Sequence, residues 1–227
     1  MRILAFDSSG AACSACAWEN GAARARRAES LGRGHAERLM PMIEEVLAEA
    51  GWRYGDLDLL AATTGPGTFT GLRIGLAALR ALALVGAKPM LGVTSLEAVA
   101  HATEPAERAG RTLLVALESK RADLYVQSFD AALAPLGEPA SLLPGALAEA
   151  YAGRAILLAG DAAARAFPHL LAARADATLA GTPGLPDAAI VAALAAGRAA
   201  SASRRPPQPL YLRPPDVTLP AAARDRA

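Results

Sequence analysis

The sequence has few aromatic residues, two cysteines and almost no excess of charge of either sign. Phe, Trp and Tyr make up 4% of its 227 residues, and its apolar content is largely alanine. Lys and Arg number 23 against 22 Asp and Glu, which gives a formal net charge of +1. A protein that holds nucleic acid by itself normally carries a clear excess of positive charge. If RNA is involved in the function, we therefore expect a partner to carry it.

Long hydrophobic runs are also missing. No stretch reaches the roughly 18 to 20 uninterrupted apolar residues that span a bilayer, and residues 1–6 lack the small-residue cleavage site of a signal peptide. The hydrophobic content of 53% is enough to bury a core in one domain or two small lobes. We therefore expect a globular, cytoplasmic protein without a membrane-spanning segment.

Cys13 and Cys16 have the CxxC spacing of redox and metal sites. They lie in a segment of period-2 alternation, however, where residues three apart point to opposite faces of a strand. The pattern therefore favours two buried small side chains over a redox or metal site. The three histidines, His35, His101 and His169, are scattered, and no motif of a serine or zinc hydrolase accompanies them.

The chain opens with three strand-like segments, at residues 2–7, 12–19 and 22–29. Asn20 and Gly21 separate the second from the third. Asn-Gly between two strands favours a type I′ turn, because that turn needs a positive φ at both central positions. The sequence therefore predicts a three-stranded antiparallel meander.

Two helices are predicted next. Residues 34–50 have apolar side chains at the i, i+3, i+4, i+7 spacing of an amphipathic helix, in which Pro41 is expected to cause a kink or to mark the start. Residues 68–86 carry a line of small residues beside a line of bulky ones, so this helix should be packed from two sides. Only Arg73 and Arg80 mark its solvent-exposed edge.

Further strands are expected at residues 58–64 and 90–93, with a third helix that begins at Thr94 or Ser95. The resulting order β-β-β-α-β-α-β-α predicts an α/β fold with a mixed sheet and helices on its faces. Ribonuclease-H-like and actin-like domains have the same order, which is an analogy of fold.

From about residue 105 the pattern restarts. Three strands and a helix are expected there, at residues 111–118, 123–130, 155–160 and 188–200. Residues 204–215 contain five prolines, which exclude a helix and predict an extended segment. We therefore expect a first lobe at residues 1–104, a shorter second lobe at 105–203, and a proline-rich tail at 204–227 that packs back on the body.

Five blocks of the sequence carry a more specific pattern: RILAFDSSGAACSACAW, GHAERLMPMIEEVL, GPGTFTGLRIGLAALRALAL, PMLGVTSLEAVA and PLYLRPPDVT. In this order they resemble the successive blocks of the bacterial TsaB family, also called YeaZ. The block that contains GPGTFTGLRIG is specific, whereas DSS alone is weak. The resemblance covers nearly all of the expected first lobe and the tail, and it is diffuse between residues 105 and 203.

The resemblance implies an actin-like (ASKHA, ribonuclease-H-like) fold of two lobes. It also implies the role of a non-catalytic dimerisation or scaffold subunit in the complex that forms threonylcarbamoyladenosine. That complex acts next to the anticodon in tRNAs reading codons that begin with adenine. In the family, the chemistry belongs to the paralogue TsaD, and the ATPase TsaE is a third partner. The chain would then meet tRNA indirectly, through the complex, and would form a homodimer in isolation.

Little of an ATPase site is left in the residues that the resemblance aligns with TsaD. The two metal-binding histidines of TsaD fall on Ser95 and Val99, neither of which is an imidazole ligand. Glu97 and His101, four apart on the same helix, supply two ligands without a third. Asp161 stands where TsaD has a glycine beside the nucleotide, and its carboxylate would repel a phosphate. We therefore expect no catalytic residues, no metal and no resident cofactor.

Three residues leave open a relic site, or a nucleotide at a partner interface. Asp7 ends the first strand, where an actin-like ATPase places its metal-organising carboxylate; a carboxylate that caps the following turn is the favoured alternative. Gly65 and Gly67 precede the second helix, whose first amides form a potential anion site.

The partner interface is expected on the two helices at residues 34–50 and 68–86. In the family, the corresponding helices of TsaB and TsaD pack as a four-helix bundle. The second helix also carries one apolar line more than a single sheet face needs, and the sequence leaves open which line faces the sheet. The candidate interface residues are Leu39, Ile43, Gly71, Leu72, Gly75, Leu76 and Leu79.

Two alternative functions are compatible with the same fold. An autonomous actin-like ATPase or kinase requires a pair of phosphate loops and a metal shell, which the residues above do not complete. A stand-alone regulatory homodimer would use the same interface as the scaffold subunit, so the sequence does not separate these two.

Overall fold

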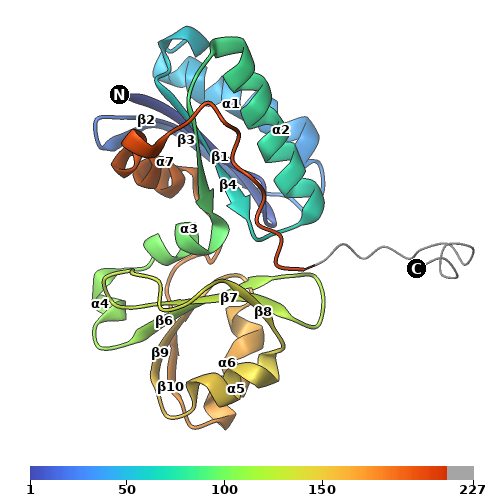
Figure 1. Cartoon of the computed structure of the whole chain (residues 1–227), viewed down its shortest axis with the longest axis vertical. Helices are drawn as coiled ribbons and strands as arrows, with labels where there is room; N and C mark the ends of the chain where they lie inside the picture. Colours follow the sequence, from blue (N-terminus) through green and yellow to red (C-terminus); the bar gives the residue numbers. More distant parts are fainter. Residues whose placement is uncertain (214–227) are drawn as a thin grey trace, which may run out of the picture.

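Two lobes lie one above the other along the long axis of the molecule, each built on one mixed sheet (Figure 1). The computed structural model describes residues 1–213, and the structural statements below refer to these residues. The first sheet contains β1 (Arg2–Asp7), β2 (Ala12–Glu19), β3 (Ala22–Ser30), β4 (Leu59–Gly65) and β5 (Met90–Thr94). The second contains β6 (Thr112–Glu118), β7 (Leu124–Phe129), β8 (Ala140–Leu142), β9 (Ala155–Ala159) and β10 (Asp176–Leu179).

The two sheets have the same topology. Their strand orders are β3-β2-β1-β4-β5 and β8-β7-β6-β9-β10. In each sheet the first strand of the lobe is central, with an antiparallel partner on one side and a parallel partner on the other. This repeat confirms the predicted α/β fold of two lobes with mixed sheets.

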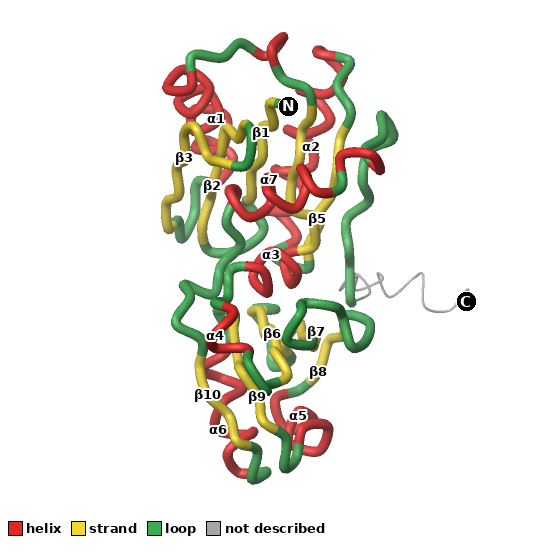
Figure 2. The backbone as a smooth tube through the Cα atoms, turned by 90° about the vertical axis from the view of Figure 1, so that its left-hand side faces the viewer, coloured by secondary structure: helices red, strands yellow, loops and turns green. Residues whose placement is uncertain are grey.

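The helices cover both faces of the first sheet and separate the lobes (Figure 2). α1 (His35–Ala50) and α2 (Phe69–Gly86) pack on one face of the first sheet, and α7 (Ala188–Gly197) packs on the other. α3 (Ser95–His101) lies between the lobes and is followed by α4 (Pro105–Arg108). α5 (Pro144–Tyr151) and α6 (Ala163–Ala172) cover the second sheet on the face opposite α3. Two 3₁₀ turns, η1 (Tyr54–Asp56) and η2 (Ala199–Ser201), complete the described elements.

The predicted elements of the first lobe are confirmed to within one or two residues. Asn20 and Gly21 both have a positive φ, of 52° and 86°, as the predicted turn requires. Pro41 lies inside α1, which begins at His35, so it does not mark the start of the helix. Cys13 and Cys16 lie on opposite faces of β2, both buried and unpaired. Burial raises the pKa of each thiol to about 12, so neither is a reactive thiolate at neutral pH.

The structure differs from the expected division into lobes at α7. The sequence assigned residues 188–200 to the second lobe, but Val191 and Ala195 pack against Ile3 and Ala5 of the first sheet. The reason is that this sheet is apolar on both faces, and α1 and α2 cover only one of them.

The segment after α7 also lies on the first lobe. Ser203 forms a bridge with Met90 of β5, and the backbone N–H of Leu210 donates to the carbonyl of Thr64 at 2.8 Å. Residues 204–213 thus run back along the first lobe, extended as predicted (Figure 1). Residues 214–227 of the predicted tail lie outside the described residues.

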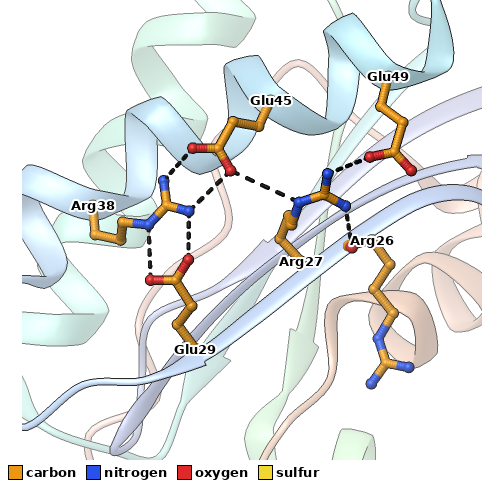
Figure 3. Close-up of polar contacts among 6 residues, drawn as sticks. All are labelled: Arg26, Arg27, Glu29, Arg38, Glu45 and Glu49. Carbon is orange, nitrogen blue, oxygen red and sulfur yellow. Dashed lines mark hydrogen bonds and ion pairs between the residues drawn. The ribbon is translucent and has the colours of Figure 1, made fainter.

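A network of arginines and glutamates ties α1 to the edge strand β3 (Figure 3). Arg38 of α1 donates hydrogen bonds to Glu29 of β3 and to Glu45 of α1, and Arg27 of β3 pairs with Glu45 and Glu49. These hydrogen bonds raise the pKa of Arg38 and lower the pKa of Glu29 and Glu45. The charges also line a strand edge, where they disfavour pairing with another chain.

The helix α2 approaches the loop between β1 and β2 with no space for a side chain between them. A Cβ at Gly71 would lie 2.0 Å from the carbonyl oxygen of Ser8, and a Cβ at Gly75 would lie 2.8 Å from the Ser8 hydroxyl. That hydroxyl donates to the carbonyl of Gly71 at 2.9 Å. The line of small residues therefore serves packing within the lobe.

Among the described helices, α2 is the one with the length and mean hydropathy, 1.5 over 18 residues, of a membrane span. These criteria are weak for a single helix, because a core helix of a globular protein meets them as well. One face of α2 is buried on the first sheet.

We expect Gly71→Ala to destabilise the fold, because the new methyl group meets backbone atoms that cannot move aside. The free energy of unfolding should fall by about 2–3 kcal/mol. Gly145→Ala in α5 is the matched control, since no atom lies within 4 Å of its Cβ position, and it should be neutral or slightly stabilising. Urea unfolding measures both variants, and equal stabilities would contradict the close contact.

Candidate functional site

A buried carboxyl group lies where β1 ends. Asp7 is 1% exposed. Its Oδ1 accepts hydrogen bonds from the Ser9 backbone N–H at 3.0 Å, from the Ser9 hydroxyl at 2.6 Å, and from the Thr63 hydroxyl. The Ser9 hydroxyl also lies 3.0 Å from the hydroxyl of Ser95, at the start of α3. Thus β1, β4 and α3 bring four polar side chains together near the junction of the lobes.

The environment of Asp7 favours an uncharged carboxyl group. Burial raises its pKa, while the hydrogen bonds from Ser9 and Thr63 act in the opposite direction. Oδ2 has no hydrogen-bond partner among the described residues. The free-energy cost of burying an unpaired oxygen is smaller for a neutral carboxylic acid than for a charged carboxylate. The hydrogen bond from the Ser9 N–H is that of an aspartate that caps its own turn. The arrangement is suited to fixing the β1–β2 turn.

The residues of α3 that were considered as metal ligands, at the positions aligned with TsaD and at the displaced pair Glu97 and His101, are engaged in structural contacts. Val99 is buried in the apolar cluster between the lobes. Glu97 forms an ion pair with Arg198, after α7. The pKa of His101 is lowered by burial, which favours the neutral imidazole. Within the described residues, no group of three or more His, Cys, Asp or Glu side chains is placed to hold a metal ion.

The chain itself fills the space between the turn after β1 and the turn after β9. A Cβ at Gly184 would lie 2.7 Å from the carbonyl carbon of Gly160, and the Leu185 Cδ2 lies 3.2 Å from the Cβ position of Gly10. Asp161 accepts a hydrogen bond from a backbone N–H of β6 at 2.9 Å, and burial raises its pKa. Through these contacts, the segment with Gly184 and Leu185 lies against both turns.

A cavity of about 480 Å³ opens at the N-terminal ends of α1 and α2. Its lining includes three basic side chains, Arg33, His35 and Lys120, and one acidic side chain, Glu37. Gly34, before α1, offers no side chain to cap the helix, so the first amides of α1 lack a side-chain acceptor. The cavity combines basic side chains with helix N-termini, a chemistry that suits an anion.

The residues predicted to hold a nucleotide do not line this cavity. Asp7 and Gly65 are buried elsewhere, and a Cβ at Gly67 would lie 2.4 Å from the Ser9 carbonyl oxygen. The basic lining was not predictable from local sequence, because Lys120 comes from the hairpin between β6 and β7 in the other lobe.

The residues predicted to meet a partner are buried inside the first lobe, which corrects the predicted interface. They are Leu39 and Ile43 of α1 and Gly71, Leu72, Gly75, Leu76 and Leu79 of α2. The line of small residues and the line of leucines are neighbours on the helix surface, so together they form the single face that packs on the sheet.

The opposite side of α2 is also apolar. Leu84 and Val85 are 85% and 88% exposed, and Ala77 and Ala81 are exposed on the same side. We call Ala77, Ala81, Leu84 and Val85 the α2 outer face. Their spacing of i, i+4, i+7 and i+8 was a signal in the sequence, but the neighbouring buried lines obscured it.

Comparison with known proteins finds similar proteins whose names refer to the modification of tRNA. The family described as "TsaD: tRNA N6-adenosine threonylcarbamoyltransferase" matches residues 28–181. The tRNA threonylcarbamoyladenosine biosynthesis protein TsaB of Escherichia coli is 37% identical over 55% of this chain and 53% of its own length. The chain thus spans about half the length of the curated relatives that it matches.

Solved structures share the fold. YeaZ from Pseudomonas aeruginosa superimposes with a TM-score of 0.78 and 27% identity, over 93% of this chain and 99% of that one. The activator of 2-hydroxyisocaproyl-CoA dehydratase from Clostridium difficile, solved with bound ADPNP, has a TM-score of 0.52 and 13% identity, over 88% and 96%. The second likeness shows the fold alone.

We expect Asp7→Asn to change the pH dependence of stability. Folding raises the pKa of Asp7 above its ordinary value of 3.8, so above pH 3.8 the folded state binds more protons than the unfolded state. Wild-type stability therefore falls as the pH rises through this window. Asn stays neutral, so the variant should gain stability relative to wild type between pH 3.8 and neutral pH. Thermal unfolding across this range, with the exposed Glu138→Gln as control, tests the idea; a pH-independent difference would contradict it.

Proposed function

Because the chain belongs to the TsaB (YeaZ) family, within the wider family of the tRNA threonylcarbamoyltransferases, we propose that it serves the formation of threonylcarbamoyladenosine in tRNA as a non-catalytic subunit. In this proposal it acts by pairing with a TsaD-like catalytic subunit in the cytoplasm. The observation that carries the pairing is the α2 outer face. Leu84 and Val85 lie almost fully in solvent on a helix whose other face is already in the core.

The α2 outer face has the chemistry of an interface core. A contiguous patch of exposed apolar side chains often marks a site of association, whereas single exposed apolar side chains are common on any protein surface. Ile74 of α2 and Met40 of α1, both partly buried, continue the apolar surface towards α1. A stable interface buries on the order of 1,600 Å², with most of its energy in a few central apolar contacts. Leu84 and Val85 are the central contacts in this proposal.

The state of the junction between the lobes supports a non-catalytic role. The carboxyl group of Asp7 is buried and accepts a hydrogen bond from the backbone N–H of Ser9, in the loop that follows it. Val99 is packed between the lobes, and Leu185 lies against Gly10. An autonomous ATPase or kinase has to admit a nucleotide at this junction, so these contacts argue against the alternative of an actin-like enzyme.

A homodimer in isolation is the second candidate, and the charges of the two helices favour it. Of the exposed acidic residues of α1, Glu37 and Glu44 are outside the network with β3, whereas α2 carries Arg73 and Arg80 and no acid. A two-fold axis places α1 of one copy against α2 of the other, so that opposite charges meet twice. A TsaD-like paralogue of the same fold would occupy the same surface, so the two assemblies exclude each other.

We also propose that the cavity beside α1 and α2 is where a nucleotide binds once the partner is in place. Ile74 lines the cavity and belongs to the same side of α2 as the proposed interface. Arg33, His35 and Lys120 would hold its phosphates. A TsaE-like ATPase is the third partner of the proposed complex, on the strength of the family alone.

We expect Leu84→Glu combined with Val85→Glu to abolish co-elution with the TsaD-like partner and to stop tRNA modification. Both side chains are exposed in the chain itself, so its fold should be retained. Burying two unpaired carboxylates should weaken the complex by at least about 100-fold. Leu171→Glu, in a half-exposed position of α6, is the control. Size exclusion, circular dichroism and nucleoside analysis are the measurements, and a folded double variant that still pairs would refute the interface.

For the cavity, we expect Arg33→Glu combined with Lys120→Glu to weaken nucleotide binding to the assembled complex by about 10-fold or more, since two attractive charges become repulsive. Partner binding should persist. Lys88→Glu, outside the cavity, controls for the change in net charge. Titration with a fluorescent ATP analogue measures the effect, and unchanged affinity would exclude the cavity.

A further inference from the structure

The charges of the chain are unevenly distributed, although they nearly cancel in total. Residues 59–96 contain no Asp or Glu, and neither do residues 188–213. These two stretches include α2 and the segment 204–213, which lie side by side on the first lobe (Figure 1). Four exposed arginines come from α2 and the segment 204–213, namely Arg73, Arg80, Arg204 and Arg205. None of the four pairs with a carboxylate of the described residues.

Contacts along the segment fix the four arginines in one strip. Ser203 is bridged to Met90 at the start of β5, the Pro207 carbonyl accepts a hydrogen bond from Arg80 at 3.5 Å, and Tyr211 reaches Phe69. The segment therefore runs antiparallel to α2, with Arg204 and Arg205 beyond one end. Figure 2 shows the same course from the side. The strip spans roughly 20 Å, from the rise of about 3.1 Å per residue of an extended chain.

Two exposed aromatic rings end the strip. Phe69 is 52% and Tyr211 is 46% exposed, and their ring centroids lie 5.9 Å apart. The guanidinium of Arg73 lies 3.6 Å from the centroid of the Phe69 ring. In a chain with 4% aromatic residues, two solvent-exposed rings in contact are not a by-product of composition. Such rings have an apolar surface that a planar base can cover by stacking.

We propose that this strip, made of Phe69, Arg73, Arg80, Arg204, Arg205 and Tyr211, binds an unpaired segment of RNA. The arginines contact phosphates, and a base stacks on the exposed part of the aromatic pair. Proteins that bind single-stranded nucleic acid commonly combine arginines with aromatic side chains on which bases stack. An anionic membrane would require apolar side chains that enter the lipid, and the two rings are instead held by contact with each other and with Arg73.

The formal charge of +1 limits the strength of this contact. It is too small for tight binding by the chain alone, so the strip adds a local contact to RNA that a complex already holds. Under the proposed function that RNA is tRNA, and in this respect the inference rests on the proposed function. The strip lies on the side of α2 that faces the segment 204–213, beside the α2 outer face. Arg73 and Arg80 border that face, whereas Arg204, Arg205 and Tyr211 come from the separate segment and are the contacts that remain for RNA when a partner is bound.

The test is fluorescence anisotropy of a labelled RNA hairpin with an unpaired loop, titrated with the whole chain at several salt concentrations. A blunt RNA duplex of equal length serves as the comparison probe. We expect a Kd on the order of 10 µM at low salt, with preference for the hairpin. Arg204→Ala combined with Arg205→Ala should weaken binding. The slope of the logarithm of the binding constant against the logarithm of the salt concentration should become shallower by about 1.4 to 1.8, since each lost phosphate contact contributes about 0.7 to 0.9.

Matched variants separate charge from position. Arg154→Ala combined with Arg174→Ala removes the same charge from exposed sites of the second lobe and should leave binding close to wild type. Tyr211→Ala should lower affinity for the hairpin about 5-fold or more and abolish the preference over the duplex. The proposal would be overturned if the Arg204→Ala, Arg205→Ala chain and the Arg154→Ala, Arg174→Ala chain bound the hairpin with equal affinity. Binding to phosphatidylserine vesicles, instead of RNA, that depends on Arg204 and Arg205 would overturn it as well.

The same variants distinguish this inference from the proposed function. The Arg204→Ala, Arg205→Ala chain should co-elute with the TsaD-like partner as wild type does. If pairing persists and RNA binding is unchanged by any strip variant, the RNA contact is wrong and the scaffold role stands. If wild type binds the hairpin through the strip but finds no TsaD-like partner, the RNA contact stands and the scaffold role fails.

Discussion

The contact between α2 and the loop after β1 is the constraint on which the first lobe depends. Gly71 and Gly75 let the helix backbone reach Ser8, and this brings Leu72, Leu76 and Leu79 onto the sheet. The contact thereby decides which side of the helix faces solvent. A helix as apolar as α2 then has hydrophobic residues left on its outer side. Core packing and the exposed apolar surface are two consequences of the same helix orientation.

The first lobe could be predicted well because its signals are local. The Asn20-Gly21 turn, the period-2 strands and the Thr68 and Thr94 caps each act within a few residues. In the second lobe, β8, β10, α5 and α6 were missed. The strands β8 and β10 have three and four residues, and helices rich in alanine show little contrast between buried and exposed positions. The position of α7 depended on a distant sheet face, which no local pattern encodes.

The candidate site could be predicted only in part, for a related reason. Asp7 was recognisable from its place at the end of a strand, but its hydrogen bonds involve Thr63 and, through Ser9, Ser95, which are far away in the sequence. The cavity needs Lys120 from the other lobe. The residues predicted for the interface lie on the side of α2 that is buried in the lobe, because both sides of the helix are apolar and the sequence pattern did not separate the side that meets the sheet from the exposed one.

The first lobe is built from two separate parts of the chain, since α7 and the segment 204–213 cover a sheet that begins with β1. During synthesis, β5 is complete at Thr94, but Ala188 of α7 follows only after the whole second lobe. At about 5 to 20 residues per second, the sheet face formed by Ile3, Ala5, Leu59 and Ala61 stays uncovered for roughly 5 to 20 seconds. The strands and helices of the second lobe, from β6 to β10, come from one continuous stretch of the chain, so its core can close first. The lobe that is translated first is therefore the last to be completed.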